Sequence, residues 1–274
     1  MFLSVVIPTL NSEKTLAECL AAIRAQSLSR DSYEIVIADA GSSDRTLAIA
    51  RDYGVETVTD NPLKTGEAGK TAGIKAAKGD VIALVDSDNI LPDPHWLERM
   101  LAPFADPDIL ATEPLEYTCR REDPPLTRYF ALLGMNDPIC LFTGNYDRIC
   151  RDGAVSVAKV KTGIVHLYCA RFGDFVRKQR RRIRDFLYFA QEKARIYPWD
   201  RQRKTGIILF CLATVFVLPL LWQTLKGAVR RPDRAWLYHV PVCWITLWVY
   251  GLGTLSKVFG RKQAPVDRSS WQKQ

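Results

Sequence analysis

The chain has 274 residues, 47% hydrophobic and 25% charged, with a formal net charge of +8. This length suffices for one sizeable domain plus further segments, and basic patches suit anionic lipid, acidic substrates or nucleic acid. The seven cysteines form no CxxC pair, which argues against a zinc site and is typical of a reducing compartment. No basic leader precedes the short N-terminal apolar run, so no signal peptide is expected.

The first 120 residues alternate between strand and helix patterns. Apolar, β-branched runs predict strands at residues 2–7, 33–39, 55–59 and 81–85. Helical spacing predicts helices at residues 12–28, 42–54 and 68–79, with Ser12 as the cap of the first. Alternation of this kind with nearly continuous apolar strands predicts a mostly parallel sheet that is covered by helices on both faces.

Polar clusters follow three of the predicted strands. They are Asn11–Glu13, Asp39–Asp44 and Asp86–Asp88. Parallel sheets bind ligands beyond the carboxyl ends of their strands. We therefore expect the three clusters to converge at one edge of the sheet and to form a ligand site there.

Asp86 and Asp88 stand one residue apart directly after the apolar run VIALV. Two like charges so close repel each other unless both face water or a cation lies between them. Hard carboxylate ligands in this spacing suit Mg²⁺ or Mn²⁺, which typically bridges one or two carboxylates to substrate phosphates. The alternative interpretation is ordinary loop capping.

Downstream, the pattern loosens between residues 103 and 153, as in a loop-rich acceptor lobe or a membrane-touching segment. A strand returns at residues 155–168, and a basic amphipathic helix follows within residues 171–200. We expect this helix to lie on an anionic membrane surface. A solvated basic face is an alternative interpretation, and nucleic-acid binding is not expected.

Residues 206–225 and 235–256 are uncharged runs, apart from His239 in the second, each long enough to cross a bilayer. They predict a transmembrane hairpin within residues 205–258, ahead of a basic tail at 259–274. Lysine and arginine counts favour a cytoplasmic N-terminal domain, and two spans place both termini on that same side. The expected location is the plasma membrane. Two buried core helices are the alternative.

The motifs VVIPTLNSEKTLAECLAAIRAQS, YEIVIADAGSSDRTLAIA, AGIKAAKGDVIALVDSDNILPDPHWLERML and VAKVKTGIVHLY together resemble the family 2 inverting glycosyltransferases. The resemblance covers residues 3–110 and 155–190. It implies a GT-A fold, a Rossmann-like α/β architecture, in a domain spanning residues 1–170. The activity it implies is metal-dependent transfer from a nucleotide-diphosphate sugar. The basic helix and hairpin are similar to members with lipid-linked or other membrane acceptors.

The same resemblance implies roles for individual residues. Those implied to hold the nucleotide and its diphosphate are Pro8, Thr9, Asn11, Glu13, Asp39, Gly41, Ser42, Lys70 and Asp86. The implied metal ligands are Asp86 and Asp88, with Mg²⁺ or Mn²⁺ as cofactor. Thr71 stands where the family often has asparagine.

The family's general base is an aspartate in a longer segment downstream of the metal motif, whereas residues 110–155 here are short. Asp137 and Asp147 are the first candidates, followed by Asp123 and Asp152. An acceptor that is a phosphate, such as a polyprenyl phosphate, is already an anion and needs less help from a base. The alternative function is a nucleotide-sugar-binding relative without turnover that scaffolds or regulates a membrane glycosylation complex.

Overall fold

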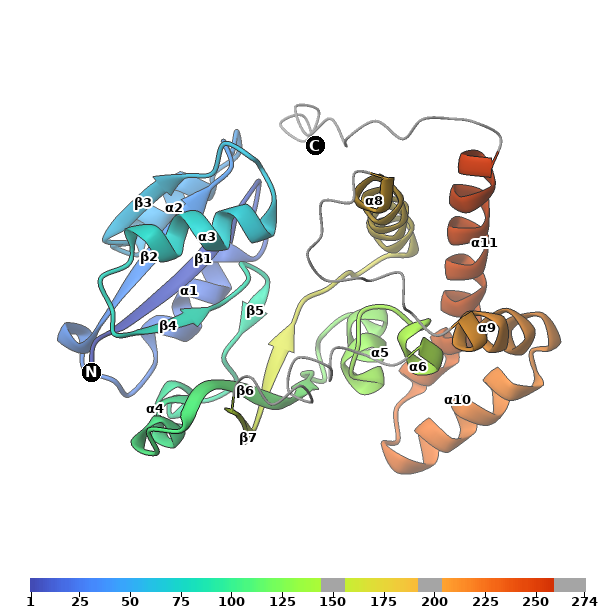
Figure 1. Ribbon diagram of the computed structural model, residues 1–274. Helices are drawn as coiled ribbons and strands as arrows, with labels where there is room; N and C mark the ends of the chain where they lie inside the picture. Colours follow the sequence, from blue (N-terminus) through green and yellow to red (C-terminus); the bar gives the residue numbers. More distant parts are fainter. Residues whose placement is uncertain (144–155, 192–203, 259–274) are drawn as a thin grey trace. The chain divides into compact units, whose positions relative to one another are not determined.

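The computed structural model describes residues 1–143, 156–191 and 204–258 (Figure 1). The described residues fall into two compact units. The first contains residues 1–116 and 156–167, and the second contains residues 117–143, 168–191 and 204–258. Part of the predicted domain 1–170 therefore clusters with the helices that follow it.

The first unit is built on a parallel sheet, as predicted. Its strands are β1 (Leu3–Thr9), β2 (Tyr33–Asp39), β3 (Thr57–Asp60) and β4 (Val81–Leu84), in the order β3-β2-β1-β4. The register pairs Thr9 with Asp39 and Asp39 with Asp60, so the strands carry their carboxyl ends to one edge. β1 and β2 form the buried centre, whereas Leu84 on the outer strand β4 is 49% exposed.

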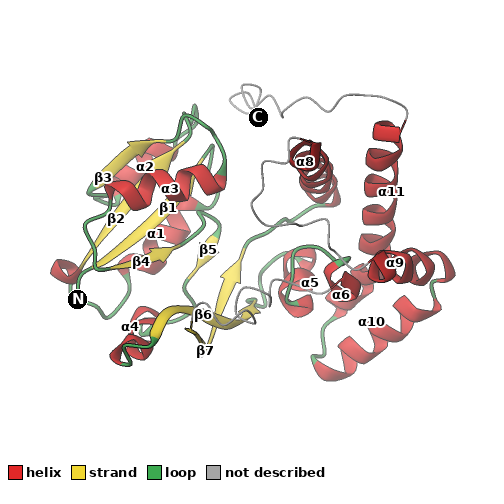
Figure 2. Cartoon of the chain, viewed as in Figure 1, coloured by secondary structure: helices red, strands yellow, loops and turns green. Residues whose placement is uncertain are grey.

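Helices flank this sheet (Figure 2). They are α1 (Leu16–Arg24), α2 (Thr46–Asp52) and α3 (Gly66–Ala76), and a short 3₁₀ helix, η1 (Arg30–Ser32), precedes β2. α1 buries Leu16, Leu20 and Ile23 completely, the face that its apolar spacing predicts. The mostly parallel α/β architecture with flanking helices is thus confirmed.

The capping role predicted for Ser12 is wrong, because α1 begins only after Thr15. The Ser12 carbonyl accepts hydrogen bonds from the backbone amides of Thr15 and Leu16, at 3.1 and 2.9 Å. Its hydroxyl instead shares a hydrogen bond with Ser87 Oγ at 2.9 Å. Ser12 thereby joins the loop after β1 to the loop after β4.

Two glycines let α3 press against β1. A Cβ on Gly73 would lie 2.3 Å from Val6 Cγ1, and one on Gly69 would lie 2.8 Å from Pro8 Cβ. Real side chains do not tolerate such distances, so this close contact depends on glycine at both positions. Lys70 lies between Gly69 and Gly73 in the sequence, so this contact also fixes how close the backbone of Lys70 lies to the sheet.

A second sheet completes the first unit. Its strands are β5 (Asn89–Ile90), β6 (Ile109–Thr118) and β7 (Ser156–His166), in the order β5-β7-β6, with β5 and β7 antiparallel. Helix α4 (Trp96–Leu101) and the 3₁₀ helix η2 (Ala102–Ala105) connect β5 to β6. β7 confirms the predicted strand, whereas β6 lies in the segment whose pattern is too loose to predict it.

The second unit is helical. It contains α5 (Pro125–Leu133), α6 (Cys140–Thr143), α8 (Phe172–Gln191), α9 (Lys204–Phe216), α10 (Leu218–Arg230), η4 (Arg234–Tyr238) and α11 (His239–Val258). Its core is aromatic, with Phe130 contacting Tyr129 at 5.0 Å and Phe175 at 5.2 Å between ring centroids. α8 confirms the predicted amphipathic helix, but part of its apolar face, including Phe175, packs inside this unit.

The first predicted span, residues 206–225, is wrong as a continuous helix. The chain breaks between α9 and α10, which differ in direction by 91°. Val217 at the break has φ 63°, and Pro219 follows in the first turn of α10. Proline cannot donate the backbone hydrogen bond that a continuous helix would need there.

In the described part of the chain, one helical segment is long and apolar enough to cross a bilayer by itself, Arg234–Ser256. The bent pair α9 and α10 qualifies only if it counts as one broken span. Many large apolar side chains of these helices are exposed, among them Phe216 (67%), Trp222 (66%) and Trp248 (60%). Exposed apolar surface on this scale indicates contact with a membrane or another protein.

Candidate functional site

Asp39 organises the loop that follows β2. Its carboxylate accepts four hydrogen bonds, from Thr9 Oγ1 (2.8 Å), Gly41 N (2.9 Å), Ser42 N (2.7 Å) and Ser42 Oγ (2.6 Å). Gly41 has φ 85°, a conformation that favours glycine. Three residues predicted to hold the nucleotide thus form one rigid turn with Asp39 as its buried centre.

Asn11 and Glu13 connect the loop after β1 to the same turn. Asn11 Oδ1 accepts a hydrogen bond from Ser43 N at 2.9 Å, and Glu13 Oε2 accepts one from Arg45 N at 3.3 Å. Asn11 itself has φ 51°, which asparagine tolerates better than most residues. The first two polar clusters therefore converge, as their positions after neighbouring strands predict.

Lys70 and Asp86 meet at the carboxyl end of β4. Lys70 Nζ lies 2.9 Å from Asp86 Oδ1, and both side chains keep substantial exposure to solvent. The lysine comes from α3 and the aspartate from the loop after β4. A cation and a carboxylate that are both accessible can bind an anionic ligand and a metal ion side by side.

His166, at the end of β7, lies against Asp88. The distance from His166 Nε2 to Asp88 Oδ1 is 3.3 Å, and Leu167 N donates a hydrogen bond to the Asp88 carbonyl at 2.8 Å. β7 therefore fixes both the backbone and the side chain of Asp88. Sequence reasoning missed His166, although its place at the end of a predicted strand was a signal that could have found it.

Asn61, directly after β3, is a second residue that sequence reasoning missed. It is buried, its Nδ2 donates to the Thr65 carbonyl at 2.8 Å, and its Oδ1 has no hydrogen-bond partner. A buried amide oxygen without a partner is uncommon and marks a position that a donor group of a ligand would satisfy. Nothing in the local pattern DNP distinguishes it from a turn asparagine.

The donor chemistry at Asp86 and Asp88 fits Mg²⁺ or Mn²⁺. Among the described residues, no three His, Cys, Asp or Glu side chains already form a complete metal cluster. Two carboxylates are nevertheless sufficient for a cation that keeps waters and also binds substrate phosphates. Cys19 lies beneath this loop, and burial, reinforced by Asp88 and Asp86, raises the pKa of its thiol. A protonated thiol is no ligand, so oxygen donors dominate here.

Residues 4–154 match the model of the family described as glycosyl transferase family 2. The match spans more than half of the chain and contains the site residues just described, except His166. The chain belongs to glycosyl transferase family 2. The matched residues include the parallel sheet and the polar loops at its carboxyl edge.

Curated relatives of this family 2 protein are glycosyltransferases. Glycosyltransferase AglE of Haloferax volcanii is 32% identical over 103 residues, which cover 36% of this chain and 34% of that protein. Glucosyl-3-phosphoglycerate synthase of Mycolicibacterium smegmatis is 34% identical over 108 residues, covering 37% and 35%. The chain thus spans about a third of the length of these two relatives.

A solved structure supports the fold over nearly the whole chain. The mannosyltransferase PcManGT of Pyrobaculum calidifontis, in complex with GDP-Man and Mn²⁺, aligns with a TM-score of 0.54 and 16% sequence identity. The alignment covers 95% of this chain and 88% of that one. At this identity the likeness concerns the fold alone.

The candidate general bases of the family 2 protein have structural partners where the structure describes them. Asp137 is buried, with Arg182 Nη1 at 3.1 Å from Oδ2 and the Tyr250 hydroxyl donating to the same carboxylate. Asp123 is equally buried and lies 2.7 Å from Arg120 Nη2. Arginine thus occupies both carboxylates, and a role for either as the general base stays a prediction. Asp147 and Asp152 lie outside the described residues.

Proposed function

We propose that the protein transfers a sugar from a nucleotide-diphosphate donor to a lipid-linked acceptor at a membrane, with inversion at the sugar. The observation that carries the proposal is the convergence of Lys70, Asp86 and Asp88 at the carboxyl edge of the family 2 sheet. Curated relatives that are glycosyltransferases, and a fold relative solved with GDP-Man and Mn²⁺, support a nucleotide-sugar donor and a divalent metal.

In this proposal the loops after β1 and β2 bind the nucleoside. The first loop contributes Pro8, Thr9, Asn11 and Glu13, and the second contributes the turn around Asp39, to which the first loop is hydrogen-bonded. The four hydrogen bonds to the Asp39 carboxylate hold the turn in shape before the donor arrives, which reduces the entropy lost on binding. Lys70 binds a diphosphate oxygen.

Asp86 and Asp88 would hold Mg²⁺ or Mn²⁺ at the diphosphate. Bound there, the cation would offset the negative charge that develops on the leaving nucleoside diphosphate. His166 positions Asp88 through the contact of 3.3 Å between Nε2 and Oδ1. Lys70 orients Asp86 in the free protein and is then available to the donor.

A lipid-linked phosphate as acceptor explains why no open general base is required. The described candidates Asp137 and Asp123 are both held by arginines. A phosphate acceptor is already an anion at neutral pH and can attack without losing a proton in the transition state. The exposed apolar helices of the second unit also favour an acceptor that is located in a membrane.

We further propose that the protein resides in the plasma membrane with the sheet-containing unit and both termini on the cytoplasmic side. This topology needs α11 and the bent α9–α10 pair each to cross once. Cysteine labelling from outside intact cells tests it. Single cysteines placed near residue 1 and near residue 274 should both be protected, and labelling of either one from outside would exclude this topology.

The catalytic proposal is tested with the full chain in membranes and a panel of radiolabelled nucleotide sugars. Transfer into a lipid-extractable product should require Mn²⁺ or Mg²⁺ and stop with a chelator. Asp88→Ala should lower turnover by about 100-fold or more, the loss of several kcal/mol of charge stabilisation. Asp52→Asn, which removes a carboxylate charge from an exposed position at the end of α2, is the control. Full metal-dependent turnover in Asp88→Ala would refute the metal site.

The second candidate function is nucleotide-sugar binding without turnover, in a protein that scaffolds or regulates a membrane glycosylation complex. The two arginine-held aspartates favour it, because neither is open to act as a base. Calorimetry with a nucleoside diphosphate and Mn²⁺ separates the two functions. Binding with no transfer to any acceptor would favour this candidate, whereas robust transfer would exclude it.

A further inference from the structure

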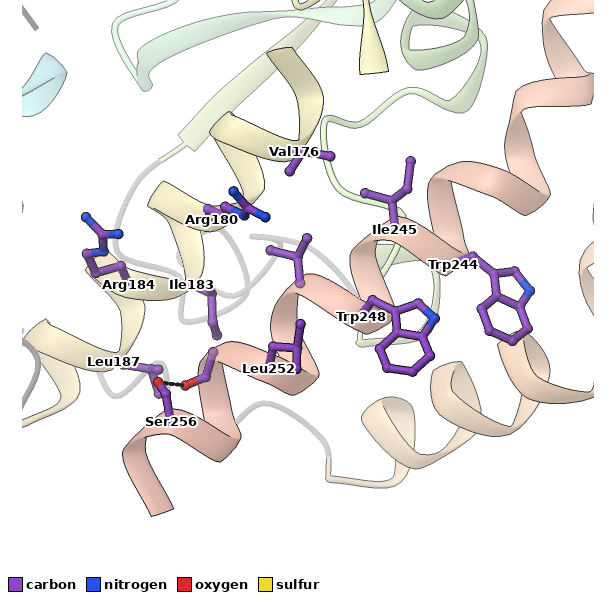
Figure 3. A pocket seen from close by; sticks show the side chains of 12 residues that line it. Val176, Arg180, Ile183, Arg184, Leu187, Trp244, Ile245, Trp248, Leu252 and Ser256 are labelled. Carbon is purple, nitrogen blue, oxygen red and sulfur yellow. Dashed lines mark hydrogen bonds between the residues drawn. The ribbon is translucent and has the colours of Figure 1, made fainter. Parts of the chain in front are cut away.

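A cavity of about 870 Å³ lies within the second unit between α8 and α11. Figure 3 shows the two helices converging where Leu187 and Ser256 lie, and separating toward Val176 and Trp244. Its walls are mainly apolar, with Ile183 from α8 and Trp248 from α11 on opposite sides. The volume falls in the range of small-molecule sites, roughly 300–1,000 Å³.

The narrow end of this cavity is fixed by close packing. A Cβ on Gly253 would lie 2.9 Å from Ile183 Cγ1, so the helices approach each other closely there. Ser256 Oγ donates a hydrogen bond to the Gly253 carbonyl at 2.7 Å, the dashed line in Figure 3. The cavity is therefore a built feature of the helix pair.

The α8 side of the cavity carries positive charge. Arg180 and Arg184 both line it, and Figure 3 shows Arg180 extending from α8 toward the space in front of Ile245. Within the residues that the structure describes, neither guanidinium has a carboxylate at ion-pair distance. Arg182 differs, because it is turned inward to Asp137.

An apolar cavity with unneutralised guanidinium groups along one side has the chemistry of a site for a lipid with an anionic head. We propose that this cavity binds the phosphate-monoester lipid that accepts the sugar, with its chain along Trp248 and Leu252 and its phosphate on Arg180. This identification rests on the proposed function. A phosphate monoester carries about −1.5 to −2 charges at neutral pH, so it suits two arginines better than the singly charged head of a membrane phosphodiester does.

Binding is measured directly on the full chain in detergent, with farnesyl phosphate as the probe and farnesol and phosphatidylglycerol as comparisons. Farnesyl phosphate should bind at least about tenfold more tightly than either, since charge-assisted hydrogen bonds contribute that much or more. Arg180→Gln should weaken it by about tenfold, whereas Arg177→Gln, the same change outside the cavity, should not. Equal effects of the two variants, or equal binding of farnesol, would overturn the phosphate site.

The apolar wall has its own matched pair of variants. Trp248→Ala should weaken the binding of farnesyl phosphate about tenfold by removing a large apolar contact with the lipid chain. Trp222→Ala, similarly exposed on α10 but outside the cavity, should leave the binding unchanged. Phosphatidylglycerol that binds as tightly as farnesyl phosphate would identify a bulk-lipid contact instead. A single-stranded oligonucleotide that competes with farnesyl phosphate would also overturn the assignment.

The test is independent of catalysis. Asp88→Ala should abolish metal-dependent donor turnover without changing farnesyl phosphate affinity, because Asp88 belongs to the other unit. Arg180→Gln should leave nucleotide-sugar binding by calorimetry intact. If the unmodified chain does not bind a nucleotide sugar, the proposed function is refuted. If it binds the nucleotide sugar but does not prefer farnesyl phosphate over the other lipids, only the cavity assignment is refuted.

Discussion

Arg182 Nη1 on α8 lies 3.1 Å from Asp137 Oδ2, in the loop before α6. The same arginine nitrogen also donates to the Asn136 carbonyl and to Gln179 Oε1, each at 3.1 Å. This network ties the loop to α8, and the Tyr250 hydroxyl extends it to α11. Asp137 is therefore a link between three segments of the second unit, and its carboxylate is saturated by that role.

A mutant cycle separates this structural role from that of a base. Asp137→Ala should destabilise the protein by about 3–5 kcal/mol, because it leaves a positive charge without its partner. The single variants Asp137→Asn and Arg182→Gln should each lower the free energy of unfolding. The double variant should lower it by less than the sum of the two, measured by denaturant unfolding in detergent. Transfer per folded molecule should stay within a few-fold of normal in Asp137→Asn. A normally stable Asp137→Asn with a loss of about 100-fold or more would instead identify a general base.

The close contact between α3 and β1 predicts a sharp difference between two glycines. Gly73→Ala should destabilise the protein by about 1–3 kcal/mol, because its Cβ would lie 2.3 Å from Val6 Cγ1 and must displace the helix. Gly66→Ala, in the first turn of the same helix, meets nothing within 4 Å and should be neutral or slightly stabilising. Thermal unfolding compares them, and equal midpoints would mean that α3 does not pack as described.

Lys70 should act on the donor. Lys70→Ala should raise the KM for the nucleotide sugar by about 10- to 100-fold, the loss of a charge-assisted hydrogen bond to phosphate. Its effect should shrink as ionic strength rises, because salt screens the wild-type contact. Lys75→Ala, an exposed lysine on the same helix, is the matched control. If both variants behave alike, Lys70 contributes only general positive charge.

The ion pair between Asp233 and Arg128 predicts that the second unit loses folding stability at acidic pH. Partial burial would raise the pKa of Asp233, but hydrogen bonds from Arg128 and from Ala235 N outweigh burial and lower the pKa. A lowered folded-state pKa contributes stability above the unfolded value, about 3.9, and loses it as the pH falls through the folded value.

Thermal unfolding between pH 7 and pH 3 measures this contribution. The melting temperature of the normal protein should decrease once the pH is lowered below about 4. Asp233→Asn should have a lower melting temperature at pH 7 and should lose less of it on acidification. Asp52→Asn, at an exposed position at the end of α2, should follow the normal curve. An Asp233→Asn variant with an unchanged midpoint at pH 7 would show that the ion pair adds no net stability.

Local patterns predicted the first unit well because its elements are fixed by short-range rules. Apolar runs become β1, β2 and β4, and the spacing of Leu16, Leu20 and Ile23 becomes the buried face of α1. β6 was missed, because its mixture of charged and apolar residues matches no single period and its pairing with β7 is long-range. His166 was missed for a related reason, since the long-range pairing of β7 with β5 brings it to Asp88.

By itself, the sequence determined the alternating α/β order, the position of the polar clusters after the strands, and the presence of long apolar segments near the C-terminus. These follow from periodicity and composition, which act along the chain. Tertiary structure alone decided that Arg182 pairs with Asp137 and that His166 supports Asp88. Such contacts depend on how distant segments meet, and packing and charge pairing between them leave no trace in local spacing.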